Sequence, residues 1–135
     1  MAKTALYLIL LALPLLAHAQ TPRAELRCTA SGEDFVYDCS IMLTRDGQPL
    51  AGAEVTMSAD MPSMPMAHSV RPAKAQPGTK PGEYKARLDL EMLGEWAIKL
   101  RLDGPVRDLL VLHYEFDSKG AKPSMGGHKM EHKKH

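Results

Sequence analysis

The residues best suited to chemistry lie in one short segment rich in methionine. Between residues 61 and 68 the chain carries three methionines and one histidine, which are Met61, Met64, Met66 and His68. Thioether sulfur is a soft, uncharged ligand that selects Cu(I) or Ag(I) over harder cations, and imidazole binds copper in either oxidation state. The segment therefore predicts a site for a soft metal ion, with Cu(I) preferred and Ag(I) as the alternative.

The spacing of these residues allows their side chains to converge. Pro62 favours a β-turn that brings the α-carbons of Met61 and Met64 within about 7 Å of each other. If the chain is extended beyond that turn, Met64, Met66 and His68 fall on one side, because side chains alternate along a strand. The two prolines of the segment would stiffen it and reduce the entropy lost on binding. We expect three sulfur atoms and one nitrogen to surround a single ion.

Methionine also has a structural use, because its flexible side chain fills gaps in a core. A Met-Pro loop could equally cap the end of a domain or contact a partner protein. Against core filling, residues 61–68 contain four candidate ligands and no leucine, isoleucine or valine. We prefer the metal site and keep contact with a partner as the alternative.

A second group of metal-binding residue types lies near the C-terminus. His128, Met130 and His132 alternate, so an extended chain would present all three on one side. Neutral histidine binds first-row metals, and methionine adds affinity for Cu(I). The alternative is a solvated basic tail whose lysines repel cations. We expect residues 118–135 to be a disordered tail when no ligand is bound, because the segment has few apolar side chains.

The N-terminus predicts export. One lysine precedes a short apolar run, and Ala17-His18-Ala19 matches the small-x-small pattern at which signal peptidase cleaves. The run is shorter than the stretch of about 20 apolar residues that a membrane-spanning helix needs, which disfavours an uncleaved anchor. We therefore expect residues 1–19 to be a signal peptide and the released protein to work in the periplasm with no stable membrane anchor.

Charge and motif content narrow the function. Cleavage after residue 19 would leave 116 residues, 135 minus 19, which is the size of one domain. Removal of Lys3 reduces the 17 basic residues to 16 and so balances the 16 acidic ones. Proteins that bind nucleic acids or membrane surfaces usually carry an excess of basic residues, so neither kind of partner is expected. The chain carries no nucleophile–base motif, zinc-protease helix, paired-carboxylate pattern or phosphate loop, and we do not expect an enzyme.

The two cysteines predict a hairpin register. If Cys28 pairs with Cys39 across the intervening turn, the numbers of paired residues sum to 67. Leu26 then faces Ile41, and apolar pairs share one face while polar pairs share the other. A one-residue slip would mix the two kinds, because side chains alternate. An oxidising compartment favours a disulfide between the two cysteines. The alternative is a thiolate metal site or redox pair, although catalytic dithiols are usually spaced C-x-x-C.

Alternating apolar and polar residues predict further strands. The pattern covers residues 84–92 and 96–102, while residues 109–116 are apolar on both parities, as expected for a strand covered on both faces. Residues 73–82, rich in Pro, Gly and Lys, indicate a loop. Six or so short strands predict an all-β fold, an immunoglobulin-like antiparallel β-sandwich over residues 20–117. Within it, we assign Trp96 to the core and His113 to a structural role.

Three motifs resemble a known family. They are GQPLAGAEV at residues 47–55, the Met-Pro-x-Met-x-Met-x-His loop, and PGEY at residues 81–84 leading to GEW at residues 94–96. Over residues 24–116 the chain resembles YtkA-like or FixH-like domains. This resemblance implies an immunoglobulin-like sandwich outside the cytoplasmic membrane, in proteins linked to copper handling, heavy-metal efflux or cytochrome oxidase assembly. Carried over to this sequence, it points to Met61, Met64, Met66 and His68.

Together these observations predict a periplasmic copper-binding protein, a Cu(I) chaperone or sequestering protein. Its partner would be a copper efflux or oxidase assembly protein. FixH-like proteins are typically membrane-anchored, whereas this chain is expected to be released, which weakens a role in oxidase assembly. The alternative function is a non-catalytic interaction module of a heavy-metal efflux or cytochrome oxidase assembly system.

Overall fold

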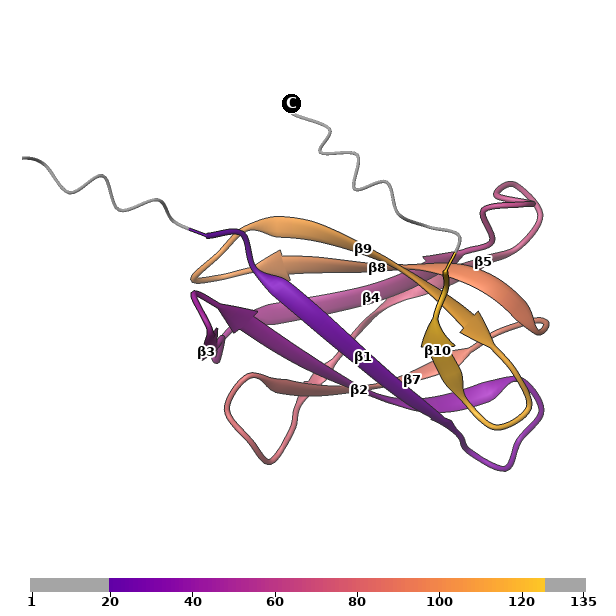
Figure 1. The fold of residues 1–135 in the computed structure, drawn as a ribbon, viewed down its shortest axis with the longest axis horizontal. Coiled ribbons are helices and arrows are strands. Elements are labelled where there is room, and N and C mark those ends of the chain that lie inside the picture. Colours follow the sequence, from indigo (N-terminus) through magenta and orange to yellow (C-terminus); the bar gives the residue numbers. More distant parts are fainter. Residues whose placement is uncertain (1–19, 126–135) are drawn as a thin grey trace, which may run out of the picture.

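The computed structural model describes residues 20–125 and shows two antiparallel sheets packed face to face (Figure 1). The predicted signal peptide and residues 126–135 lie outside the described part. The strands are β1 (Arg23–Ala30), β2 (Val36–Arg45), β3 (Gln48–Pro49), β4 (Glu54–Asp60), β5 (Ser69–Lys74), β6 (Gln76–Pro77), β7 (Glu83–Asp89), β8 (Gly94–Asp103), β9 (Asp108–Phe116) and β10 (Ala121–Pro123).

Each sheet has five strands. The first has the order β1-β2-β7-β6, with β3 paired to β2, and the second has the order β10-β9-β8-β4-β5. The arrangement confirms the expected all-β antiparallel sandwich of the immunoglobulin-like class. In residues 20–125 no helix has the length and apolar character needed to cross a membrane.

The hairpin of β1 and β2 has the register predicted from the cysteines. Its pairs run from Arg23 with Thr44 to Ala30 with Tyr37, and each sums to 67. Cys28 and Cys39 form a disulfide, so the structural interpretation of the cysteines is confirmed. The covalent link joins directly opposed residues, which prevents this hairpin from slipping in register.

Aromatic residues join the two sheets. Tyr37 of β2 meets Phe116 of β9 edge to face, with 5.0 Å between ring centroids. The Tyr37 hydroxyl donates to the carbonyl of Asp117 (2.6 Å), and the Tyr114 hydroxyl accepts from the backbone N–H of Leu26 (3.2 Å). These hydroxyls are thus hydrogen-bonded inside the core, which removes the cost of burying them.

The sandwich continues past the residue at which the tail was expected to start. The β9–β10 turn is closed by the Asp117 carboxylate, which accepts from the N–H groups of Lys119 (2.8 Å) and Gly120 (3.0 Å). These two bonds hold the pKa of the Asp117 carboxyl below its usual range. Strand β10 then pairs with the end of β9. Residues 118–123 therefore belong to the folded domain, because the turn returns the chain to an open sheet edge.

The segment expected as a loop at residues 73–82 contains the end of β5 and the whole of β6. Both strands lie at sheet edges and contain a proline, Pro72 in β5 and Pro77 in β6. Proline has no backbone N–H to donate to a neighbouring strand, so it is disfavoured in inner strands but tolerated in an edge strand. The prolines therefore mark edge strands here, and only residues 78–82 form the expected loop.

Strand β9 is covered on one face only, contrary to the expectation from its apolar residues. Leu109 and Val111 are exposed on the outer face of the second sheet, whereas Tyr114 and Phe116 are buried. No layer of residues 20–125 covers this outer face, because the sandwich has only two sheets. The apolar residues at both odd and even positions of β9 therefore did not indicate that both faces of this strand are buried.

Removal of the disulfide should lower stability without changing the fold. The bond closes a loop with a sequence separation of 11 residues. In the chain-entropy model, a link of this length contributes about 2–3 kcal/mol. We expect the Cys28→Ala, Cys39→Ala double variant to lose that amount in urea unfolding and to keep its far-UV circular dichroism spectrum. An unchanged unfolding midpoint would contradict the structural role.

Candidate metal site

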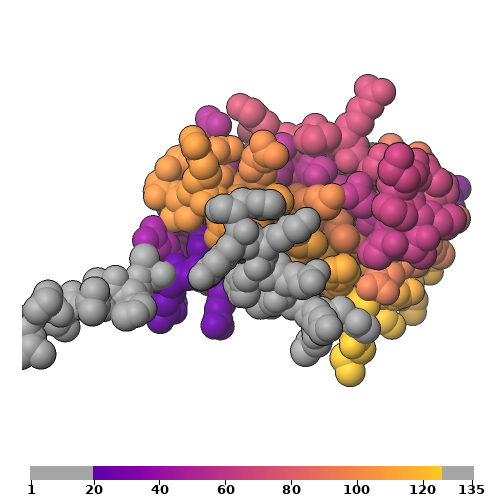
Figure 2. Space-filling model, turned by 90° about the horizontal axis from the view of Figure 1, so that it is seen from above, coloured from indigo at the N-terminus to yellow at the C-terminus, as the bar shows by residue number. Residues whose placement is uncertain are grey.

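The methionine-rich loop lies at one end of the second sheet. It joins β4 to β5, and the β7–β8 loop lies at the same end of the sandwich (Figure 1). In the space-filling view, the magenta segment that includes the loop stands out at one end of the molecule (Figure 2). The position follows from sheet pairing, since Asp60 at the end of β4 is opposite Ala97 near the start of β8.

The first half of the loop has the predicted geometry and the second half does not. Met64 N–H donates to the Met61 carbonyl (3.1 Å), which closes the expected turn around Pro62. The N–H groups of Ala67 and His68 then both donate to the Met64 carbonyl, at 3.1 and 3.2 Å. The chain therefore turns again after Met64, and the expectation of an extended segment from residue 64 to 68 is wrong.

The second turn has a physical reason. Met61 N–H donates to the His68 carbonyl (3.2 Å), because the chain must return to pair β5 with β4. An extended chain from Met64 would lead away from the sheet. The result is that backbone hydrogen bonds connect Met61, Met64 and His68 to one another.

The four predicted ligands differ in exposure. Met61 is 5 % exposed and belongs to the core cluster, where its Cε lies 3.3 Å from the position of a Cβ on Gly94. Met64 is 40 % exposed and Met66 is 98 % exposed. The His68 side chain is 26 % exposed. Exposure therefore differs between the four residues. The Met61 thioether is buried, Met64 and His68 are partly exposed, and Met66 is almost fully exposed.

The sequence did not indicate that His68 contacts Glu91 of the β7–β8 loop. The Glu91 Oε2 lies 2.5 Å from Nδ1 of His68. The two residues are 23 apart in sequence, and no local motif connects them. Only the packing of the β4–β5 loop against the β7–β8 loop brings them together. Glu91 therefore joins the candidate site as a neighbour of one predicted ligand.

Clusters of histidine, cysteine and carboxylate side chains do not occur in the described part of the chain. Among residues 20–125, no three histidine, cysteine or carboxylate side chains gather in a way that could hold a metal ion. The second predicted group, His128, Met130 and His132, lies outside the described residues.

Comparison with known families now decides the membership of the chain. The YtkA-like family model matches residues 24–101. The chain belongs to the YtkA-like family. The matched region extends from β1 into β8 and includes both the methionine-rich loop and Glu91. No curated protein and no solved structure shows significant similarity to the chain. The YtkA-like resemblance is confirmed, and the FixH-like resemblance stays a prediction.

Trp96 and His113 of this YtkA-like protein both lie outside the methionine-rich loop. Trp96 is fully buried, which confirms its assignment to the core, and its indole N–H donates to the Met92 carbonyl (3.2 Å). His113 lies partly exposed on β9, with Nδ1 3.4 Å from Oε1 of Glu95. Neither side chain contacts residues 61–68 through a hydrogen bond or ion pair described for residues 20–125.

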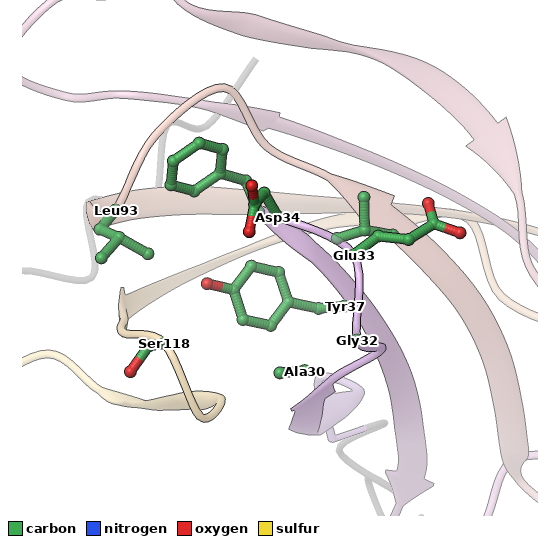
Figure 3. Close-up of a pocket in the computed structure, with 9 residues that line it drawn as sticks. Ala30, Gly32, Glu33, Asp34, Tyr37, Leu93 and Ser118 are labelled. Carbon is green, nitrogen blue, oxygen red and sulfur yellow. The ribbon is translucent and has the colours of Figure 1, made fainter.

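A shallow cavity of about 190 Å³ lies at the β1–β2 turn. Figure 3 shows Tyr37 in its middle, with Leu93 and Ser118 on one side and Glu33 on the other. Burial, and secondarily the Asp117 carboxylate, raises the pKa of the Tyr37 phenol, in keeping with its role as a neutral donor. Glu33 pairs with Arg87 (2.8 Å). Two polar residues of the lining, Tyr37 and Glu33, thus have structural partners.

Stability measurements should separate the buried methionine from the exposed one. Met61→Ala removes a core side chain, and we expect a loss of about 2–4 kcal/mol in urea unfolding. Met66→Ala touches almost no protein surface and should stay within about 0.5 kcal/mol of the unchanged chain. Both measurements use metal-free protein. Equal effects of the two substitutions would show that the loop is not seated as described.

Proposed function

We propose that this YtkA-like protein binds Cu(I) at the β4–β5 loop and acts as a periplasmic copper chaperone or sequestering protein without catalysing a reaction. The observation that carries the proposal is the set of backbone hydrogen bonds that draws Met61, Met64 and His68 together at the sheet end. Cu(I) prefers soft thioethers and accepts imidazole, so these residue types fit it better than a hard cation.

The exposure of each side chain suggests a different role for each proposed ligand. Met64 and His68 are accessible and closely connected through the backbone, so they supply the first sulfur and nitrogen. The Met61 side chain is buried in the core cluster, and its sulfur is the proposed third ligand. Met66 extends into solvent, which suits a thioether that first contacts an arriving ion or passes it to a partner.

The proposed compartment rests on the predicted signal peptide and is supported by the disulfide. Cys28 and Cys39 are bonded, and such bonds persist in oxidising compartments such as the bacterial periplasm. Cleavage after Ala19 would release a protein whose folded part begins within a few residues, since β1 starts at Arg23. The proposed receiver of the ion is a copper efflux or oxidase assembly protein.

The competing proposal is a non-catalytic interaction module, and one observation favours it. Met64, Met66 and Leu93 are exposed apolar side chains on two loops at the same end of the sandwich. Exposed apolar groups gathered in one place often mark a surface for another protein. In that case the methionines would supply contact area and no metal ligand.

Anaerobic titration of the mature protein with Cu(I), against a competing chelator, tests the proposal. We expect stoichiometric binding that weakens about tenfold or more with Met64→Leu and with His68→Ala, because even the outer-shell partners of metal ligands are worth about 10- to 100-fold. Met42→Leu is the matched control, since this methionine lies on β2 of the other sheet and should leave the affinity unchanged.

Deletion of residues 124–135 separates the two predicted ligand groups. If the loop binds the ion, the shortened protein keeps a site that Met64→Leu weakens. If the loop substitutions have no effect and the deletion abolishes binding, the C-terminal segment is the site. If neither form binds Cu(I), the interaction module replaces the metal site as the proposed function.

A further inference from the structure

The ring of His68 is held by a carboxylate, and this contact determines which nitrogen can face a metal. Nδ1 lies 2.5 Å from Oε2 of Glu91, while the backbone N–H and carbonyl of His68 are both used within the loop. The backbone bonds position the α-carbon but leave the side-chain rotamer and tautomer open. Glu91 is the group that fixes both.

Glu91 is itself held from both sides. Leu90 N–H donates to the Phe35 carbonyl (2.9 Å), and the Met92 carbonyl accepts the buried indole N–H of Trp96 (3.2 Å). The residues before and after Glu91 are thus tied to the β1–β2 turn and to the core. A carboxylate on such a segment has a defined position, although its side chain is 57 % exposed.

The chemistry of the contact selects one tautomer. An ionised carboxylate only accepts hydrogen bonds, so Nδ1 must carry the proton that it shares with Glu91. In a neutral imidazole the free electron pair then resides on Nε2. Carboxylate–histidine–metal arrangements use this geometry to orient a ligand and raise its basicity.

We propose that Glu91 is a positioning residue that holds His68 in the Nδ1–H tautomer and so makes Nε2 the metal-binding atom. The metal-binding part of this inference rests on the proposed function. The tautomer itself is a property of the metal-free protein.

Charge supports the same assignment. Methionine and neutral histidine are uncharged ligands. They therefore leave the positive charge of a bound Cu(I) uncompensated. Asp60, the other carboxylate beside the loop, is paired with Lys99. Among the side-chain contacts described for residues 20–125, Glu91 has His68 as its partner, and its carboxylate would supply a negative charge close to a bound ion.

Nitrogen-15 NMR of the mature, metal-free protein tests the tautomer directly, by correlation of the ring nitrogens with the carbon-bound protons. We expect His68 to be protonated at Nδ1. Glu91→Ala should shift His68 toward the Nε2–H form, and Glu91→Gln, which keeps an acceptor oxygen, should restore Nδ1–H at least in part. The matched control is Glu95→Ala, which removes the carboxylate near Nδ1 of His113 and should leave His68 unchanged.

Cu(I) affinity gives the second readout. We expect Glu91→Ala to weaken binding about 10- to 100-fold and Glu91→Gln to weaken it less. The urea midpoint of the metal-free protein should stay close to that of the unchanged chain, because the Glu91 side chain is 57 % exposed and a contact screened by solvent adds little stability. Glu95→Ala should again have no effect on affinity.

Four results would overturn the inference or part of it. An Nε2–H tautomer in the unchanged protein, or a His68 tautomer that ignores Glu91→Ala, removes the positioning role. A loss of affinity with His68→Ala but none with Glu91→Ala overturns the role of Glu91 in binding and leaves the proposed function intact. Absence of Cu(I) binding by the unchanged chain overturns the proposed function and the metal-binding role together, while the NMR result still decides the tautomer.

Discussion

Burial of Trp96 is the constraint on which the loop end of the sandwich depends. Its side chain is fully enclosed between the sheets, and a buried indole N–H needs an acceptor. The acceptor is the Met92 carbonyl, four residues earlier, so the β7–β8 loop must fold back over the ring. That loop then presents Glu91 toward His68 on the neighbouring β4–β5 loop. A core residue thereby determines the position of a charged group at the surface.

The same arrangement explains why soft ligands and a rigid frame occur together. Met61 packs into the core beside Gly94, which anchors the start of the β4–β5 loop, and the backbone bond from Met61 to His68 anchors its end. Between these anchors, exposure increases toward Met66. The copper-binding role proposed above would use such a gradient, because a bound ion must be held in place and yet remain within reach of a partner.

Some elements were predictable because their signals are local or pairwise. Cys28 and Cys39 specified the register of β1 with β2, since a slip would have exposed apolar residues and separated the thiols. The β-turn around Pro62 was predictable from proline at its second position. Residues 64–68 were not, because their path is determined by the need to close the hairpin between β4 and β5. The exposure of Leu109 and Val111 likewise depends on whether a third layer exists, which the pattern of one strand does not contain.

Residue types and their spacing were enough to predict the class of fold, the disulfide hairpin, membership of a family through short motifs, and the presence of soft-metal ligand types within eight residues. These properties follow from side-chain alternation, turn chemistry and residue identity, all of which act over a few positions. The burial or exposure of each methionine, and the contact of Glu91 with His68, could be learned only from the packed sheets and loops. Those outcomes depend on the packing of segments more than 20 residues apart, for which neither segment carries a signal of its own.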